Sequence, residues 1–450
     1  MSTRETWTTR AGFIFAAVGS AVGLGNIWSF PFQTASNGGA AFLVVYLLAV
    51  FLIGFPTMLA EFVIGRRSEQ NAISAFERLG FSNWTFTGAL GVFAAFVTLA
   101  FYSVVGGWVL RYIVGSLTGA YFGDTAGYFA AISAGPGAIV THAAFMAITI
   151  GIVAFGVADG IERATKFMIP AIIVLLIGLA GWGATLSGAG AGYSYYLSPD
   201  VDVILSNFGS IVPSAMGQAF FTLSLGFGVM IAYASYLGSD DSLPGDSAII
   251  VVLNTVVALL AGFAVFPVLF STLEDPTTTS GGMGTAFTAL AGAFGQLPAG
   301  QVLGFVFFVV LLFAALSSSI SLLEAPTSYV VDTYDYDRWK IAVGVGVVTF
   351  VVGVPSTFGI TWLAFYNDLV FNVLLPVAVF LIAVFVGWVA DAEAFDELGR
   401  GSVVGDVPGT APLTTIWLWW VRVVVPIVVL YTLYLGVTSL YTGLTTGGYF

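Results

Sequence analysis

The stretch "AVGLGNIWSFPF", residues 21–32, interrupts an apolar run with groups that break helices. Gly23 and Gly25 stand two residues apart, Asn26 follows them, and Pro31 comes five residues later. An unwound stretch in a membrane helix frees backbone N–H and C=O groups, which are tolerated only inside protein or beside a cavity. The freed carbonyl groups suit a hard cation such as sodium, and the N–H groups that open the next half-helix attract a carboxylate. The spacing therefore predicts a site for a cation and an acid group at this break.

A second apolar run has closely spaced glycines in the same way, in "GQAFFTLSLGFG", residues 217–228. It lies five predicted spans after the first, in a unit of opposite topology. Paired breaks of this kind are typical of inverted-repeat secondary transporters, which bind substrate and ions between the two breaks. The alternative for the first run is that Gly19 and Gly23, spaced as GxxxG, serve only helix packing. The matching second break favours the binding site.

The elements that position these breaks must be membrane helices. The 450 residues are 58% hydrophobic and 8% charged, which indicates a polytopic membrane protein. The apolar runs are continuous and lack the ten-residue alternation of a transmembrane barrel, so an all-α fold is predicted. Runs long enough to cross a bilayer predict about eleven spans, near residues 11–35, 41–64, 85–110, 138–158, 167–187, 208–237, 246–271, 302–331, 341–354, 361–390 and 413–440. The run at 341–354 is the shortest of them.

We expect one transmembrane domain over residues 1–450, with no soluble domain. Within it, the first inverted repeat covers 11–187, the second covers 207–390, and 413–440 is an additional final helix. Lys and Arg fall at the N-terminus and in every second loop, which predicts a cytoplasmic N-terminus and, with eleven spans, an extracellular C-terminus. The polar start "MSTRETWTTR" does not resemble a cleavable signal, so the first helix is expected to stay.

Two segments between the spans have their own interpretation. Residues 281–297 are expected to form a short helical hairpin or re-entrant piece on the outer side. Residues 391–412 are expected to be a charged cytoplasmic connector before the last span.

Charge and reactive residues limit the function. The net charge of −12 predicts a milieu of high ionic strength, as in a halophile, with an acidic bias of no significance as the alternative. The absence of cysteine excludes disulfides and thiolate sites. With a single His142 and scattered intramembrane carboxylates, an enzyme is not expected. Buried Glu61 and Glu324 are costly in lipid unless paired or protonated, and we expect Glu61 to lie beside Arg66 and Arg67.

Several long motifs, in order, carry a resemblance: "RETWTTR", "AVGLGNIWSFPF", "NGGAAFLVVYL", "FFTLSLGFG" and "SSSISLLEAP". Over essentially the whole chain, the sequence resembles the neurotransmitter:sodium symporter family, with its LeuT-type fold. The resemblance implies sodium-coupled symport of a neutral, apolar amino acid by alternating access, in the cell membrane, as a monomer or weak homodimer. Two alternatives stay open: a carrier of another small zwitterion, such as taurine or a betaine, and an amino-acid-gated channel or sensor.

The resemblance also implies two sodium sites. The first is formed by the Ala21 carbonyl and the side chains of Asn26, Thr222 and Asn254, completed by the substrate's carboxylate. The second is formed by the carbonyls of Gly19, Val22 and Ala314 and the hydroxyls of Ser317 and Ser318. For the "ALSSS" stretch, the alternative is interhelical packing of small residues.

By the same resemblance, the substrate pocket is formed by Ala21, Gly23, Leu24, Gly25, Thr98, Tyr102, Phe221, Thr222, Ser224, Phe227, Ser318 and Leu322. Leu24 and Gly25 would supply amide donors, and Tyr102 a hydroxyl. Monoamine carriers of the family have aspartate where this chain has Gly23, so an amino acid substrate is implied.

The outer gate departs from the family pattern. Ser29 replaces an arginine, and Asn367, with Asp368 next to it, stands at the position of an aspartate. We expect a Ser29–Asn367 or water-mediated contact, together with Tyr102 and Phe221, to close the outer side.

The inner gate matches the family in Arg4 and Trp7, with Asp332 and Tyr236 as the expected partners. Chloride is left open. The residues at its family position would be Tyr46, Gln218, Thr222 and Asn254, but Ala258 replaces a serine, and neither 254 nor 258 is acidic.

Overall fold

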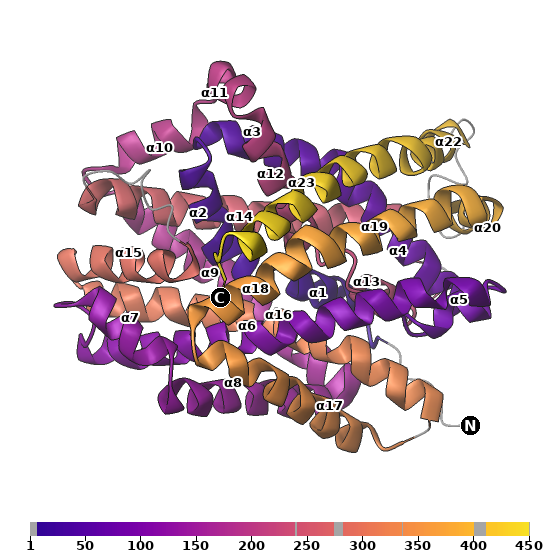
Figure 1. Cartoon of the computed structure of the whole chain (residues 1–450), viewed down its shortest axis with the longest axis horizontal. Coiled ribbons are helices and arrows are strands. Elements are labelled where there is room, and N and C mark those ends of the chain that lie inside the picture. The colour runs from indigo at the N-terminus through magenta and orange to yellow at the C-terminus, as the bar shows by residue number, and fades with distance from the viewer. Residues whose placement is uncertain (1–6, 239–240, 274–281, 335, 400–410, 450) are drawn as a thin grey trace.

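The computed structural model describes residues 7–238, 241–273, 282–334, 336–399 and 411–449. These residues form helices, most of which run side by side along the long axis of the molecule (Figure 1). Nine helices in this part of the chain are long and apolar enough to cross a membrane, and α1 with its continuation, bent by 50°, makes a tenth. The all-α prediction is confirmed, and the chain is a multi-pass membrane protein.

The helices fall into three groups along the chain. The first group is α1 (Arg10–Ala21), η1 (Gly25–Ser29), α2 (Phe30–Ser36), α3 (Ala40–Ala49), η2 (Val50–Gly54), α4 (Phe55–Ser68), α5 (Ser74–Arg78), η3 (Ser82–Trp84), α6 (Thr85–Thr118), α7 (Thr125–Ser133), α8 (Pro136–Ala154), η4 (Val157–Glu162) and α9 (Arg163–Gly183). The second group is α10 (Ala189–Leu197), α11 (Val201–Ser206), α12 (Phe208–Thr222), α13 (Val229–Ala234), α14 (Leu243–Thr272), α15 (Gly282–Gln296) and α16 (Gly300–Tyr334). The third group is α17 (Arg338–Gly353), η6 (Val354–Thr357), α18 (Ile360–Leu369), η7 (Val370–Leu374), α19 (Leu375–Val384), η8 (Phe385–Val389), α20 (Asp391–Gly399), α22 (Ala411–Trp419), η9 (Trp420–Val424) and α23 (Val425–Thr445).

Prolines explain four short π-helical segments. Pro31, Pro56, Pro376 and Pro426 each follow such a segment by two residues. In each case the residue before the proline donates its N–H to the carbonyl five residues earlier, as Phe30 does to Gly25. Proline has no N–H and its ring clashes with the carbonyl four residues before it, so an extra residue in the preceding turn relieves the conflict.

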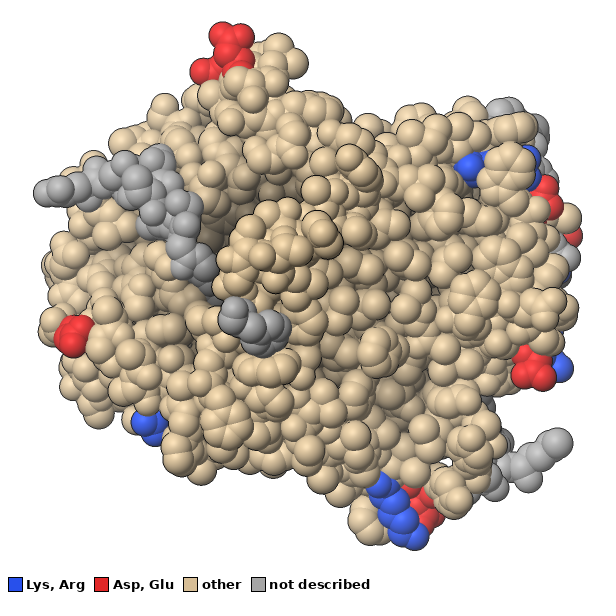
Figure 2. Space-filling model, viewed as in Figure 1, with Lys and Arg blue, Asp and Glu red and all other residues tan. Residues whose placement is uncertain are grey.

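Uncharged surface dominates the face seen in Figure 2, where Lys, Arg, Asp and Glu lie toward the edges. A broad band without charged side chains is what hydrocarbon requires of a lipid-facing surface. The two broken helices are enclosed by the others, since α1 contacts α9, α14 and α16, and α13 contacts α4, α6 and α16.

The sixth expected span, 208–237, is divided between α12 and α13. The helix α13 is six residues long and falls outside the nine long helices. Together with the bent first span, this divided helix fits the expected number of eleven, which stays a prediction.

Two of the expected connecting segments contain helices. Residues 282–296 form one continuous helix, α15, and no hairpin. The start of the expected connector, residues 391–399, is helix α20, which contacts α4. Arg66 Nε donates to Glu397 Oε1 at 2.5 Å, and both side chains are buried, so this helix is docked by an ion pair. The rest of the connector, 400–410, lies outside the described residues.

Candidate functional site

The first helix breaks at the predicted glycines. Val22 leaves the helical conformation with ψ of 97°, and a new helical segment begins at Gly25. The freed Ser20 carbonyl accepts hydrogen bonds from the Ser224 hydroxyl at 2.8 Å and the Ser318 hydroxyl at 3.0 Å. One side chain from the second break and one from α16 therefore satisfy the backbone that the first break exposes, as burial demands.

The break also exposes N–H groups. Leu24 N–H donates to the Tyr102 hydroxyl at 3.1 Å, and Gly23 N–H donates to Asn26 Oδ1 at 3.2 Å. Both donors are fully enclosed in protein.

The second break, residues 223–228, also follows from its sequence. Gly226 and Gly228 have φ of 78° and 71°, a left-handed conformation that glycine adopts without a steric cost. Ser224 adopts φ of 53° there, which is unusual for a residue with a side chain. Glu61 Oε1 accepts the Gly226 N–H at 2.7 Å. The expectation that Glu61 lies beside Arg66 is wrong, because Arg66 pairs with Glu397 and Glu61 holds the broken backbone.

A cavity of about 260 Å³ lies between the two breaks. Its lining consists of Ser20, Ala21, Gly23, Gly25, Tyr102, Phe221, Ser224, Phe227, Ser318 and Leu322. None of these described lining residues is charged.

Most of the expected pocket residues meet there, and three do not line it. Leu24 turns its N–H to Tyr102, Thr98 bonds the Ala94 carbonyl at 2.7 Å, and Thr222 lies beside Asn254. Ser20 was not expected in the lining. A polar residue in an apolar run, directly before the break, is the signal that marks it.

Oxygen atoms converge on one side of the cavity, at the expected first sodium site. The Asn254 side-chain oxygen accepts a hydrogen bond from Asn26 Nδ2 at 2.8 Å. The Asn254 side-chain nitrogen donates to the Thr222 hydroxyl at 3.3 Å. Asn26 Nδ2 donates to the Asn254 backbone carbonyl at 3.2 Å. The structure thus brings together the four residues Ala21, Asn26, Thr222 and Asn254.

The residues of the expected second sodium site also lie together. The Ser317 hydroxyl is 3.0 Å from the carbonyl oxygens of both Val22 and Ala314. Gly19 packs against Ser317, since a Cβ on it would lie 3.4 Å from that of Ser317. The Ser318 hydroxyl instead turns to Ser20 and the cavity.

These oxygens are all uncharged. Among the described residues, no three His, Cys, Asp or Glu side chains come together as metal ligands. Neutral carbonyl, hydroxyl and amide oxygens suit a hard cation of low charge better than a transition metal.

On one side the cavity is covered by rings. The Phe221 ring lies 4.4 Å, centroid to centroid, from that of Phe371 and close against Gly25. The expected Ser29–Asn367 contact is not the one that forms. The Ser29 hydroxyl donates to Gln218 Oε1 at 3.0 Å, and Asn367 Nδ2 donates to Asp368 at 3.1 Å.

Trp7, expected at the inner gate, packs against the end of α13. Its Nε1 donates to the Tyr233 carbonyl at 3.0 Å, and its ring meets those of Tyr233 and Tyr236 edge to face. The Tyr236 hydroxyl donates to Glu324, which also pairs with Arg338, so buried Glu324 has the partner its burial requires.

Of the other two expected inner-gate residues, the structure describes only Asp332. Asp332 accepts a hydrogen bond from Asn71 Nδ2 at 3.3 Å. Arg4 lies outside the described residues.

Of the residues considered for chloride, Gln218 holds the first break. Gln218 donates its Nε2 to the Gly25 carbonyl at 2.8 Å while its oxygen accepts from Ser29. Tyr46 is fully buried with its hydroxyl toward Thr222.

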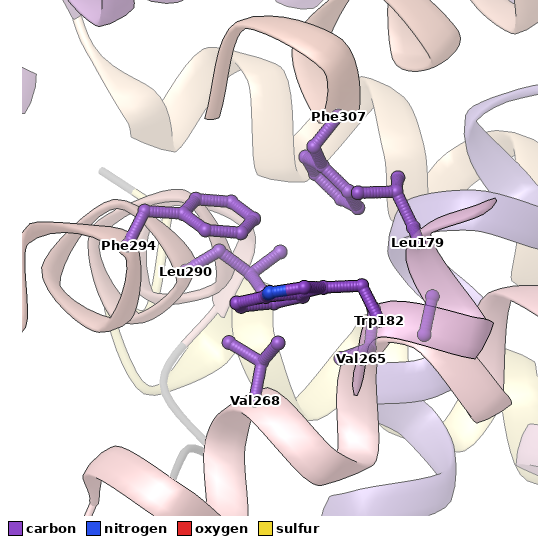
Figure 3. A pocket seen from close by; sticks show the side chains of 8 residues that line it. Leu179, Trp182, Val265, Val268, Leu290, Phe294 and Phe307 are labelled. Carbon is purple, nitrogen blue, oxygen red and sulfur yellow. The ribbon is translucent and has the colours of Figure 1, made fainter. Parts of the chain in front are cut away.

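A second cavity, of about 240 Å³, lies where α9, α14, α15 and α16 meet. Figure 3 shows its side chains pointing toward one another, with the Trp182 indole among Leu290, Phe294 and Val268. The lining is apolar apart from that indole nitrogen. It lacks the convergent polar groups that orient a zwitterion, so the cavity between the breaks is the candidate site.

Known proteins agree with this geometry. The model of the sodium:neurotransmitter symporter family matches residues 4–125 and 134–449. The uncharacterized sodium-dependent transporter YhdH of Bacillus subtilis is 37% identical, over 94% of this chain and 96% of its own. An uncharacterized sodium-dependent transporter of Methanocaldococcus jannaschii is 34% identical, over 99% and 93%.

A solved structure is also similar. The crystal structure of MhsT in complex with L-phenylalanine superposes with a TM-score of 0.86, at 38% identity, covering 96% of this chain and all of that one. With family, relatives and fold in agreement, the chain belongs to the sodium:neurotransmitter symporter family.

Proposed function

We propose that this transporter couples the entry of sodium to the uptake of a neutral, apolar amino acid. The observation that carries the proposal is the cavity between two broken helices, with uncharged oxygens gathered beside it. Backbone N–H groups at the start of the second half of the first span would attract a carboxylate. The hydroxyl of Tyr102, which already bonds Leu24 N–H, would be the second donor to it.

Coupling follows from charge. In the first site Ala21, Asn26, Thr222 and Asn254 offer no negative charge, so a bound cation gains an anionic partner only from the substrate. Each ligand then raises the affinity for the other by the same factor. The Asn254 side-chain oxygen, which lies beside Asn26 Nδ2 and the Thr222 hydroxyl, would be one of the ligands of the cation.

The lining supports an apolar amino acid. Phe221, Phe227 and Leu322 supply apolar walls, and Gly23 leaves no acidic side chain to pair with an amine. The complex of MhsT with L-phenylalanine agrees with a substrate of this class. The hydroxyls of Ser20, Ser224 and Ser318 are bonded to backbone or to each other, so they add little polarity to the cavity.

Two sodium ions per cycle fit the two oxygen clusters, with chloride left open. Two positive charges moving down about 100 mV release ~4.6 kcal/mol, which supports roughly a thousandfold accumulation. We further propose alternating access by two inverted repeats, 11–187 and 207–390, with 413–440 as a final helix. Eleven spans, a cytoplasmic N-terminus, an extracellular C-terminus and a monomer or weak homodimer complete this proposal.

Uptake into proteoliposomes tests the proposal. With labelled L-phenylalanine and an inward sodium gradient, we expect accumulation above equilibrium that is lost when potassium replaces sodium. Equilibration without accumulation would indicate a channel or sensor instead. Competition by betaine or taurine, but by no neutral amino acid, would indicate the other zwitterion carrier. The same assay at molar potassium chloride tests the halophile prediction from the net charge of −12.

A further inference from the structure

The end of the chain folds back onto the transporter. Helix α23 ends at Thr445, and Gly447 adopts a left-handed φ of 72°. Gly448 N–H then donates to the Gly443 carbonyl at 2.9 Å, which reverses the chain. The Tyr449 ring therefore lies directly on Gly443, where a Cβ would come within 2.4 Å of it.

Tyr449 has a specific partner on the tenth span. Its hydroxyl donates to Asp368 Oδ2 at 2.5 Å, while Oδ1 of Asp368 accepts from Asn367. The ring also meets Phe365 edge to face at 5.8 Å. Burial and the adjacent carboxylate raise the pKa of Tyr449, which keeps the phenol protonated as a donor. Only 8% of Tyr449 is exposed, so its contact with Asp368 is enclosed by the surrounding protein.

The contact lies close to the cover of the cavity. Phe371, three residues after Asp368, is the residue whose ring packs on Phe221 above the pocket. One residue further, the Asn372 carbonyl lies 2.5 Å from the position of a Cβ on Gly436, so α23 presses closely on η7. The last helix thus contacts this part of the tenth span both at its end and along its side.

We propose that Tyr449 is a positioning residue of the outer gate. By holding Asp368, it fixes the outer half of the tenth span against α23 and so keeps Phe371 over Phe221. The last residues of the chain thereby regulate access to a cavity that they do not touch. The inference rests on this cavity being the transport site of the proposed function.

The chain has no cysteine, so a single introduced cysteine reports access cleanly. We choose Ser29→Cys, because Ser29 lies on the first broken helix beside Gln218. The reaction of this cysteine with a membrane-impermeant maleimide is followed in sodium-free proteoliposomes with and without Tyr449→Phe. Loss of the hydroxyl should increase the labelling rate about ten- to a hundredfold, the range expected when a hydrogen bond to a charged group is lost.

The control is Tyr441→Phe, because Tyr441 is an exposed tyrosine on α23, the helix that precedes Tyr449. It should leave the rate unchanged. In an Asp368→Ala background, Tyr449→Phe should have no further effect, since coupled residues are not additive. An unchanged rate in Tyr449→Phe, or an equal increase with and without Asp368, overturns the inference. The labelling reaction requires no amino acid. Its result therefore tests the role of Tyr449 even if the protein does not take up phenylalanine.

Discussion

The Glu61 carboxylate accepts the N–H of Gly226 at 2.7 Å, and so joins α4 to the unwound part of the sixth span. The other oxygen of Glu61 has no hydrogen-bond partner among the described residues. Only one oxygen at this position is therefore needed to accept the Gly226 N–H, and the second oxygen of the carboxylate is not required.

This predicts different effects for two substitutions of Glu61. Glu61→Gln keeps an acceptor for Gly226 and should change stability little. Glu61→Ala leaves a buried N–H unpaired and should cost about 1–3 kcal/mol. Thermal unfolding of the purified protein in detergent separates the two. Equal losses in both variants would contradict the interpretation that a neutral acceptor is enough.

Gly23 has no room for a side chain. A Cβ there would lie 2.2 Å from Ser318 Oγ and 3.0 Å from the Tyr102 hydroxyl. Gly23→Ala should therefore abolish phenylalanine binding, measured by a thermal shift with the amino acid. Gly23→Ala with Ser318→Ala removes the closest atom and should recover part of the binding. Gly217→Ala, where a Cβ meets nothing within 4 Å, is the matched control and should bind normally.

Asn254→Asp tests the origin of the coupling. A permanent carboxylate among the neutral oxygens should replace the substrate's negative charge. Sodium affinity without amino acid should then rise about tenfold, and the further increase on adding phenylalanine should shrink by a similar factor. Sodium titrations followed by tryptophan fluorescence measure both. Thr255→Val is a neighbouring control, because the Thr255 hydroxyl only bonds the Val251 carbonyl. A variant with unchanged coupling would remove the first site from the proposal.

Trp7 should hold the inner side closed. Trp7→Ala loses the packing on Tyr233 and Tyr236 and should cost roughly 1–3 kcal/mol of the closed state. A single cysteine at Ser20, at the bottom of the cavity, should then react faster from the cytoplasmic side of inside-out vesicles. Trp7→Phe keeps a ring but loses the hydrogen bond to the Tyr233 carbonyl, so its effect should be smaller, about 1 kcal/mol. If Trp7→Ala left the labelling rate unchanged, another residue would have to close this path.

Much of the site was predictable because its signals are local. Glycines at 23, 25, 226 and 228 mark the breaks through backbone geometry alone, and the apolar runs mark the spans. Contacts between distant residues were not predictable. Arg66 and Glu397 are 331 positions apart in the sequence, and Tyr449 and Asp368 are 81 apart. No periodicity in the sequence predicts such pairs. The direct contact of Ser29 with Asn367 does not form in this structure, since Gln218 on α12 is the partner that the fold brings to Ser29, and the water-mediated alternative stays a prediction.

The π-helical turn η7 also sets the rotation of one half of the tenth helix relative to the other. An added residue turns everything beyond it by ~100° about the axis. The face of α18 that carries Asp368 toward Tyr449 is thus out of phase with the face of α19 that packs on α4, α6 and α12. Such a helix can pack against two sets of neighbours at once. A regular helix of equal length could be aligned with only one of these sets at a time.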